Sequence, residues 1–504
     1  MKTLYRADLV RTLTHPETGA WLLTDGRHVQ RVGSGEPPQA DRVVDLPGGT
    51  IVPGFIDAHV HLTGTGASLD NAAVEATTSA AELLALARER CSEAEGPAIL
   101  SGFDESRWDR PEHPSIAELD AISGSTPLAI VRADGHVALA NTAAIALAGV
   151  AGDAGVERDG GGSPTGRLTE QAVDRLARWA ANALTDHQVQ ELQLKGAGLA
   201  AARGVTSIHE MQMPQTAGMR DLQVLLGHRE RLPVDAVPIV ATMDLPLVID
   251  HGLPAVGGDL PVDGSIGART AAVTEPYAGE GGRGVTYYED DALAEFFHAG
   301  HTAGLQVGVH AIGDRAIEQV LQGWERVYRM LDSRERRHFR ARRHRIEHCE
   351  MISPAQVERV AVLGLGVSVQ PAFDREWGAP GGLYDAALGW HRAEPMNPFR
   401  MMLERGIEVG AGSDAPVTPL GPLDAIGAMQ AHHEPTQRLS RLEAIRLHTI
   451  GSARLAHQED KKGALGPGMH ADFVVFERDP FETETLEGLE PILTVSLGRV
   501  VYAA

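Results

Sequence analysis

Two histidines separated by one residue, His59 and His61, lie in the segment GFIDAHVHLTG at positions 54–64. The apolar run before them, residues 51–56, is typical of a buried strand. Side chains two apart on a strand point to the same side, so both imidazoles can reach one point beyond its end. Imidazole is the commonest neutral ligand for zinc and related ions. The pair therefore predicts part of a metal centre. The alternative is two ordinary surface or core histidines.

Three further residues could complete such a centre, and each follows a strand-like segment. They are His310 in VGVHAIGD, His348 in RIEHCE and Asp414 in AGSDAPV. Taken singly, each has an ordinary explanation, since a lone histidine is usually a hydrogen-bonded core or surface residue and an aspartate after Gly-Ser is usually a helix N-cap. Together with His59 and His61 they supply four imidazoles and one carboxylate. We therefore predict that all five bind a divalent metal.

The middle of the chain alternates strand-like and helix-like segments, as βα units around a parallel sheet do. Eight strands are predicted, ending at residue 61 and in the segments 204–211, 233–243, 260–265, 305–310, 342–349, 365–371 and 407–414. Eight such units predict an α/β fold, a (β/α)8 TIM barrel, whose active site lies at the C-terminal ends of the strands. All five predicted ligands fall at such ends.

Both ends of the chain have another pattern, short strand-like runs separated by turn signals. Because chain ends tend to lie close together, we expect 1–53 and 463–504 to form one small β-sandwich domain. Residues 54–68 would then hold barrel strand one, and 198–462 the remainder of the metal-dependent barrel. The segment 69–197 is too long for one helix and two loops, so we expect an insertion or cap there.

The amino-acid composition excludes some classes of binding partner and indicates a cellular compartment. The 504 residues are 43% hydrophobic and 22% charged, with 45 basic against 68 acidic residues and a net charge of -23. This balance argues against nucleic acid or an anionic membrane as partner, because both require a basic face. The two cysteines, Cys91 and Cys349, cannot build a disulfide framework, and neither a secretory signal nor a long apolar run is evident. We expect a cytoplasmic protein.

Several segments together resemble the amidohydrolase superfamily, in particular the branch of N-substituted formamide deformylase-like enzymes. The segments are VPGFIDAHVHLTG (52–64), VRADGHVALANTAA (131–144), GVTSIHE (204–210), DGSIGARTAA (263–272), VHAIGDRAI (309–317), RIEHCE (345–350), SVQP (368–371), GAGSDAPV (410–417) and LGPGMHADFVVFERDPF (465–481). The resemblance implies a metal-bearing barrel, a urease-like β-sandwich made from both termini and a long insertion after strand one. It also implies hydrolysis of a bond between carbon and nitrogen.

The sequence departs from that family at one position. Binuclear members usually carry a lysine four residues before the Asp of the DGS motif, and its carbamate bridges two metals. Here the position holds Asp259. Because aspartate is short, we expect neither a carbamylated lysine nor a reach comparable to one, and we predict a single ion. Zinc is expected, although these ligands also accept iron or manganese. Glu210 is an alternative carboxylate ligand, or a salt-bridged rim residue.

The resemblance also suggests catalytic and substrate-binding roles. Asp414 would take a proton from water and pass it to the leaving nitrogen, and His348 or His310 would polarise the carbonyl. His136, in the insertion, is a candidate for substrate binding or an exposed turn residue. Trp377 and Arg392, in the long stretch 371–395, could line the site or simply hold that stretch in place.

Three functions remain open from the sequence. The first is a metal-dependent hydrolase of a linear or cyclic amide. The second is a mononuclear deaminase of a heterocyclic or amidine substrate, which the absence of a glutamate beside His310 disfavours. The third is a binding protein without catalysis. A small-molecule substrate is expected, and a homodimer is one expectation for the assembly.

Overall fold

The computed structural model describes residues 1–504 except 106, 107, 109, 111, 133–136, 170 and 280. Its contacts form two compact units. The barrel unit comprises Met1–His61, Ala197–Met213 and Arg229–Ala504, and the insertion unit comprises Leu62–Gly196 and Pro214–His228. Among the described residues, no helix combines the length and the apolar character that a membrane span requires.

The barrel unit contains an eight-stranded sheet in which every neighbouring pair is parallel. Its strands are buried on both faces, as expected for a sheet covered by helices. In order across the sheet they are β5 (Phe55–Val60), β11 (Val205–Gln212), β12 (Asp235–Val240), β13 (Ala255–Val256), β14 (Gln306–Ala311), β15 (Arg345–His348), β16 (Gly366–Val369) and β17 (Glu408–Ala411).

The first and last strands meet through the residues that follow them. The Asp414 N–H donates to the His59 carbonyl at 2.8 Å, and the His61 N–H donates to the Ala415 carbonyl at 2.9 Å. A bridge between Val60 and Ala415 continues the parallel pairing. These contacts nearly close the barrel, which confirms the predicted fold class.

The fourth strand differs from the prediction. It was expected at 260–265, but β13 lies earlier and has two residues. Gly257 and Gly258 follow it with φ of 87° and 55°, in the left-handed region that ends a strand. Pro261 then makes only an isolated bridge to His310. The chain therefore reaches this end of the barrel as a glycine turn instead of a long strand.

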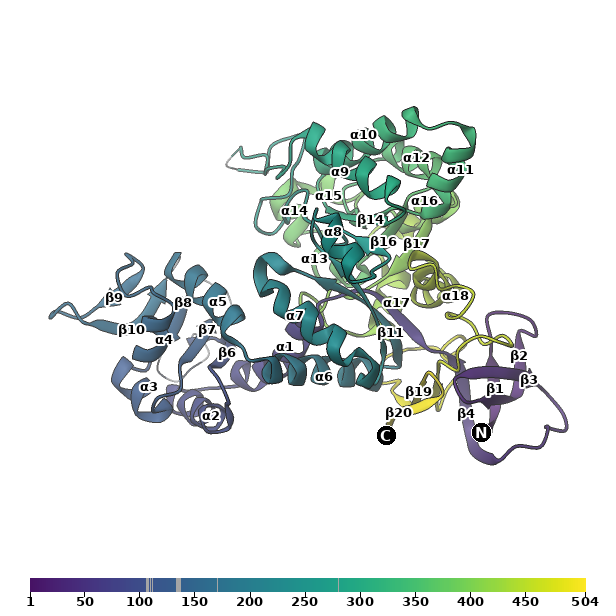
Figure 1. Ribbon diagram of the computed structural model, residues 1–504, viewed down its shortest axis with the longest axis horizontal. Coiled ribbons are helices and arrows are strands. Elements are labelled where there is room, and N and C mark those ends of the chain that lie inside the picture. Colours follow the sequence, from purple (N-terminus) through teal and green to yellow (C-terminus); the bar gives the residue numbers. More distant parts are fainter. Residues whose placement is uncertain (106–107, 109, 111, 133–136, 170, 280) are drawn as a thin grey trace. The chain divides into compact units, whose positions relative to one another are not determined.

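Helices connect the barrel strands, and the stretch 371–395 folds into three short helices (Figure 1). α10 buries the face that carries Ile317, Leu321 and Trp324, and its Trp324 stacks on Phe297 of α9 with ring centres 4.1 Å apart. The helices are α8 (Leu245–Asp250), α9 (Asp290–Thr302), α10 (Asp314–Met330), α11 (Ser333–Arg342), α12 (Pro354–Leu363), α13 (Pro371–Trp377), α14 (Leu383–Leu388), α15 (Trp390–Ala393), α16 (Phe399–Glu404), α17 (Pro422–Ala431), α18 (Arg441–Arg446) and α19 (Ser452–Leu455), with a π-helical turn at Leu447–Gly451.

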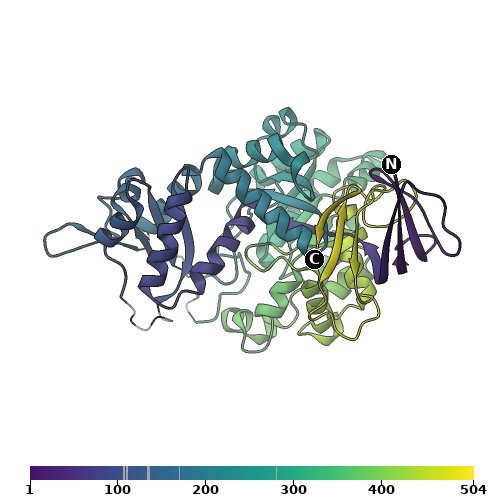
Figure 2. The ribbon, with the colours of Figure 1, turned by 90° about the horizontal axis from the view of Figure 1, so that it is seen from below.

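Both ends of the chain build one seven-stranded sheet, visible in Figure 2 as purple and yellow strands. The two ends join where β18 pairs antiparallel with β4, and β1 pairs parallel with β4 on its other side. The strands are β1 (Lys2–Arg11), β2 (Thr18–Asp25), β3 (His28–Gly33), β4 (Arg42–Pro53), β18 (Phe473–Phe476), β19 (Pro491–Ser496) and β20 (Arg499–Ala503).

The insertion unit has a five-stranded sheet of its own, in the order β6-β7-β8-β10-β9. A separate core, which includes Leu83, Leu100, Phe103 and Leu128, packs α2 and α3 against it. The elements are α1 (Leu62–Glu75), α2 (Ala80–Glu93), β6 (Ala98–Phe103), α3 (Ile116–Ser123), β7 (Leu128–Arg132), β8 (Val137–Ala140), α4 (Thr142–Leu147), β9 (Val156–Arg158), β10 (Pro164–Thr169), α5 (Gln171–Ala183), α6 (Asp186–Ala202) and α7 (Pro214–His228).

Candidate metal centre

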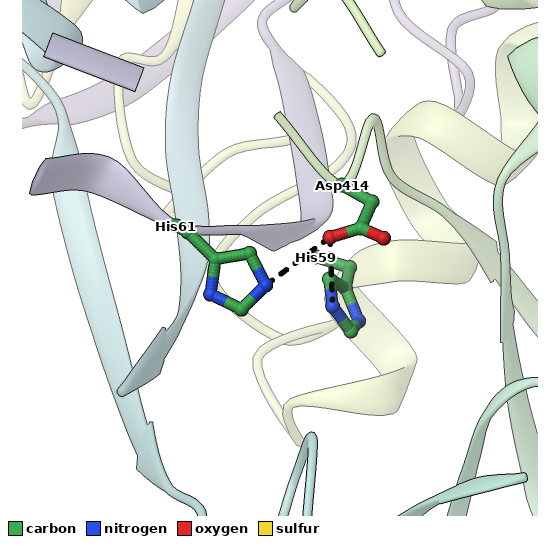
Figure 3. A group of neighbouring side chains, drawn as sticks. All are labelled: His59, His61 and Asp414. Atoms are coloured by element: carbon green, nitrogen blue, oxygen red, sulfur yellow. Dashed lines mark ion pairs between the residues drawn. The ribbon is translucent and has the colours of Figure 1, made fainter. Parts of the chain in front are cut away.

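Three of the predicted ligands point toward one another at the junction of the first and last strands (Figure 3). His59 Nε2 lies 3.4 Å and His61 Nε2 lies 3.1 Å from Asp414 Oδ1. His59 is the fifth residue of β5 and His61 follows its end, so strand alternation turns both rings to one side. Asp414 is brought to them by the backbone hydrogen bonds that close the barrel.

The two remaining predicted ligands reach the same cluster through Asp259. Its Oδ1 lies 3.1 Å from His310 Nδ1 and 3.3 Å from His348 Nε2. The same carboxylate lies 3.7 Å from His59 Nε2 and 3.5 Å from His61 Nε2. All four imidazoles therefore surround the Asp259 carboxylate, with Asp414 beside two of them.

Each imidazole has one nitrogen fixed by the protein and the other directed to the cluster. A carboxylate or carbonyl partner sets the ring's orientation and tautomer, as it does for metal-binding histidines in general. The fixed contacts are His59 Nδ1 with Glu347 at 3.0 Å, His61 Nδ1 with the Met211 carbonyl at 2.9 Å, His348 Nδ1 with the Gln370 side chain at 2.8 Å, and His310 Nε2 with the Gly264 carbonyl at 3.3 Å.

The donor set fits a divalent ion. His59 Nε2 and Asp414 Oδ1 are buried and have no hydrogen-bond partner among the described residues, although they lie 3.4 Å apart. A buried polar atom without a partner is costly, and a cation between the two would satisfy both. Imidazole nitrogens and carboxylate oxygens are the donors that zinc and similar ions use.

The carboxylates and the imidazoles shift each other's pKa. Burial by itself would lower the pKa of the His61 imidazole, but the negative charge of the adjacent Asp414 carboxylate outweighs burial and raises the pKa to about 9. Asp259 does the same to His310, whose pKa is also raised to about 9 against burial. Burial would raise the pKa of Asp259 and Asp414, but the histidines, His59 first, hold both well below the usual range.

The expectation about the reach of Asp259 is wrong. The side chain is short, but its carboxylate lies 3.1–3.7 Å from nitrogens of four histidines, and a glycine turn after β13 precedes it. A Cβ on Gly257 would lie 2.1 Å from the Gly308 carbonyl oxygen of β14, so no larger residue fits that approach. The glycine turn therefore allows the chain before Asp259 to pack closely on β14.

Two residues of the cluster have unusual backbone conformations. His348 has φ of 67° and Asp414 has φ of 54°, in the left-handed region that non-glycine residues seldom occupy. Such strain persists where the surroundings determine it, often at functional sites. At Asp414 the surroundings include Asp57, whose Oδ1 accepts the Ser413 N–H at 2.9 Å and the His59 N–H at 3.1 Å.

Further residues that support the cluster were quoted in sequence motifs but given no role. Glu347 in RIEHCE and Gln370 in SVQP orient imidazoles, as described above. Asp263, of the DGS motif, accepts the N–H groups of Ala272, Ile312 and Gly313 at 2.8–3.0 Å and so holds the chain that follows His310. Their polar side chains next to strand ends were the only sequence signal.

The predicted substrate residues have different settings. His136 lies outside the described residues. Trp377 packs on Phe373 with ring centres 4.6 Å apart, and Phe373 is parallel to the His348 ring at 6.0 Å. Arg392 donates to the backbone carbonyls of Leu388, Glu275 and Pro276 at 2.8–2.9 Å. The structure thus brings Trp377 within two rings of the cluster and shows Arg392 holding loops together.

Glu210, the alternative ligand, is a buried residue of β11 and not a rim residue. Its Oε1 accepts a hydrogen bond from Gln212 at 2.8 Å. Among the described residues it belongs to none of the groups whose donor atoms lie close enough together to share an ion.

A second group of possible ligands, Asp374, His432 and His433, is occupied by protein contacts. His432 Nε2 meets the Asn397 carbonyl at 3.0 Å, and its Nδ1 accepts the Glu434 N–H. His433 Nδ1 bonds to Asp374, and its Nε2 lies 2.9 Å from the carbonyl of residue 394. All four ring nitrogens have protein partners, so this group connects the two ends of the stretch 371–395 and leaves no nitrogen for a metal ion.

Comparison with known proteins agrees with this geometry. The model of a family described as the amidohydrolase family matches residues 42–502. The chain belongs to the amidohydrolase family. It is 28% identical to the putative amidohydrolase YtcJ of Bacillus subtilis over 100% of this chain and 99% of that protein. It is 25% identical to the N-substituted formamide deformylase of Arthrobacter pascens over 89% of this chain and 87% of that protein.

Solved structures share the fold of this amidohydrolase. An uncharacterized metal-dependent hydrolase from Pyrococcus furiosus superposes with a TM-score of 0.80 at 24% identity, over 96% of this chain and 100% of that one. The family confirms the prediction of a metal-dependent hydrolase that acts on carbon–nitrogen bonds. The substrate and the kind of metal are matters of proposal.

Proposed function

We propose that this amidohydrolase cleaves a non-peptide carbon–nitrogen bond in a linear or cyclic amide, with water activated at one zinc ion. One observation carries the proposal. Each of the four imidazoles has one ring nitrogen held by a protein partner, which leaves its other nitrogen directed at two buried carboxylates. Two of the inner atoms, His59 Nε2 and Asp414 Oδ1, are buried without a hydrogen-bond partner among the described residues, and a bound cation would satisfy both.

His59, His61 and Asp414 are proposed to hold the ion, since their donor atoms lie within 4.8 Å of one another. When bound, a divalent ion lowers the pKa of a coordinated water toward about 7 and polarises a carbonyl oxygen. Zinc is proposed because imidazole and carboxylate donors suit it, and iron or manganese would use the same set.

The chain's own residues supply the proton transfers. The Asp414 carboxylate is proposed to accept a proton from the attacking water, through the oxygen that does not hold the ion, and to return it to the leaving nitrogen. His310 and His348, both within 3.3 Å of Asp259, are proposed to donate a hydrogen bond to the developing oxyanion. Trp377 and Phe373 are proposed as an apolar wall for the substrate, and the roles of Arg392 and His136 in binding it remain predictions.

Formamides are the first substrate class to test, because one relative is named N-substituted formamide deformylase. The experiment incubates zinc-loaded and chelator-treated enzyme with N-substituted formamides, N-acyl amino acids and cyclic imides. Release of a carboxylate with an amine, only from the loaded enzyme, supports the proposal. Release of ammonia from amidine or heterocyclic substrates would identify a deaminase instead. Two tightly bound ions per chain would contradict the single-ion site.

A compartment and an assembly are also proposed for this enzyme. Cys91 and Cys349 are buried and free, which suits a reducing compartment such as the cytoplasm. A homodimer is proposed from the resemblance alone, and light scattering of the purified protein tests it.

A further inference from the structure

A pocket of about 520 Å³ lies at the end of the barrel opposite the metal centre. Its lining includes residues 234–238, where β12 begins, and residues 252–254, which precede β13. The strands of a parallel barrel all begin at one end, and the active site lies at the other. A space of this size can hold a small molecule, and that molecule would take no part in the proposed hydrolysis.

Three arginines from distant segments line this pocket. Arg27 lies in the turn between β2 and β3, Arg229 in the turn before β12, and Arg499 at the start of β20. All three are exposed, and none forms an ion pair with a carboxylate in the described part of the chain. A guanidinium group is always charged and carries five N–H donors, so three of them without carboxylate partners around one cavity suit an oxyanion.

Close packing brings the three arginines together. Gly498 has φ of 71°, and a Cβ there would lie 2.0 Å from the carbonyl oxygen of the residue before Arg27. The turn that carries Arg27 therefore lies against the residue before Arg499. Arg499 Nη2 donates to the Leu232 carbonyl at 3.1 Å, and the Leu232 N–H donates to the Arg229 carbonyl at 3.2 Å. These contacts hold the segments of all three arginines at one place.

The carboxylates of the pocket do not cancel this positive charge. Asp235 lies 3.1 Å from the Nζ of Lys462, and the same ammonium group lies 2.9 Å from Asp472. Glu230 is the other acidic residue of the lining. The four cations of the pocket and its floor thus outnumber the three carboxylates, in a chain whose net charge is -23. A local excess of positive charge on an acidic protein favours an anion at this place.

We propose that this pocket binds a small anion with at least two negative charges, carried by phosphate-like or carboxylate groups, and that Arg27, Arg229 and Arg499 hold it. Guanidinium groups bind both kinds of group with paired hydrogen bonds. Arg27 and Arg499 belong to the sheet made from both chain ends, and Arg229 precedes a barrel strand. The bound anion therefore connects this sheet to the barrel and stabilises the folded chain.

The first experiment is calorimetric titration of the full chain with sulfate, phosphate and succinate at constant ionic strength. At least one of these dianions should bind at one site per chain, and the tightest identifies the favoured group. The double variant Arg27→Ala/Arg229→Ala should weaken binding at least about tenfold, since hydrogen bonds to charged groups are lost. A wild type that binds none of the three at millimolar concentration would overturn the proposal.

The matched control is Arg88→Ala/Arg334→Ala, which removes the same charge from two exposed positions outside the pocket. It should bind the anion as the wild type does. Equal weakening by both double variants would show that only net charge matters, and would contradict the pocket. Arg229→Lys keeps the charge but not the planar donors, so it should bind more weakly than wild type and more tightly than Arg229→Ala.

A third variant separates this pocket from the metal centre. Asp414→Ala removes a proposed metal ligand and should bind the anion with unchanged affinity. Loss of anion binding in Asp414→Ala would place the anion at the metal centre and refute the proposal. Unchanged anion binding would support it whether or not the metal site is as proposed.

A crystallographic readout decides the case if the arginine variants fail to fold. Selenate is a tetrahedral dianion whose selenium scatters anomalously. In wild-type crystals soaked in selenate, an anomalous peak should lie beside the guanidinium groups of Arg27, Arg229 and Arg499. Peaks only at other positions, or an adventitious ion only at a contact between neighbouring molecules, would overturn the proposal.

Discussion

His59 Nδ1 lies 3.0 Å from Glu347 Oε2, and both side chains are fully buried. Arg345 in turn donates to Glu347 at 2.8 and 3.0 Å, so the carboxylate stays charged with a pKa of about 2: burial would raise it, but the charge of Arg345 and the His59 hydrogen bond outweigh that. This buried chain fixes the His59 ring and the tautomer that leaves Nε2 free to bind.

Substitution of Glu347 should therefore weaken metal binding although it removes none of the proposed ligands. Glu347→Gln should lower zinc affinity about 10–100-fold, the usual cost of altering the partner of a metal-binding histidine. It also leaves Arg345 buried without its counter-charge, so the melting temperature should fall. Isothermal titration and thermal melts measure both effects. Unchanged zinc affinity would show that Glu347 only supports the fold.

Asp414→Asn should fold but lose at least about a hundredfold in turnover, the scale expected for a positioned acid and base. The amide keeps an oxygen for the ion but cannot take up a proton. The measurement is kcat on the best formamide at saturating zinc. Asp221→Asn, a change in a buried carboxylate of the insertion unit, is the control and should retain activity. An active Asp414→Asn enzyme would refute the proton-transfer role.

Removal of the metal should lower stability. An ion at 100 times its Kd stabilises the folded state by about 2.7 kcal/mol. For a chain of this size we expect chelation to lower the melting temperature by about 2–3 °C. Calorimetry with and without chelator tests this. The same treatment of an Asp414→Ala variant should have a smaller effect, and an equal effect would place the stabilising ion elsewhere.

Metal loading should not depend on dissolved carbon dioxide. A carbamylated lysine forms only with carbon dioxide, whereas Asp259 is a carboxylate from the start. Metal-free protein should regain activity with zinc equally fast and fully in buffers depleted of bicarbonate and in buffers supplemented with it. A requirement for bicarbonate would reveal a carbamate at an unrecognised lysine.

His448 should make the protein less stable in acid. It is fully buried in the π-helical turn, and burial lowers its pKa to about 4. An unfolded histidine has a pKa of about 6.5, so between these values the unfolded chain binds the extra proton and stability falls as the pH drops. The loss reaches about 3 kcal/mol.

Denaturant melts of His448→Leu from pH 7.5 to pH 4.5 test this prediction. The variant should lose less stability on acidification than the wild type, whereas His298→Leu, at an exposed position, should follow the wild type. If both variants show the same acid dependence as the wild type, the folded protein binds the proton at His448 as readily as the unfolded chain does, which contradicts the prediction.

The parts of the fold that could be predicted are those with local signals. His59 and His61 follow a buried strand, and each of His310, His348 and Asp414 stands where a strand ends, so periodicity located them. The fourth strand could not be located this way. It is only Ala255–Val256, and its position depends on Gly257 packing on Gly308, a contact between distant segments.

The same reason explains why Asp259 was misjudged. Side-chain length is visible in a sequence, but the distance of a backbone from the barrel axis is not. The role of Glu347 could not be predicted either, because it depends on one hydrogen bond to His59 across the barrel. Such partners can be found only once the strands are arranged around the axis.

The hydrogen bonds between Asp414 and His59 and between His61 and Ala415 have a consequence for biosynthesis. The residues proposed to bind the ion also join the first barrel strand to the last, so a ribosome must make almost the entire barrel before these residues can meet. A half-made chain would therefore offer the cell no competent site. Capture of the ion would mark closure of the barrel, and a protein truncated before β17 should emerge unable to retain the ion.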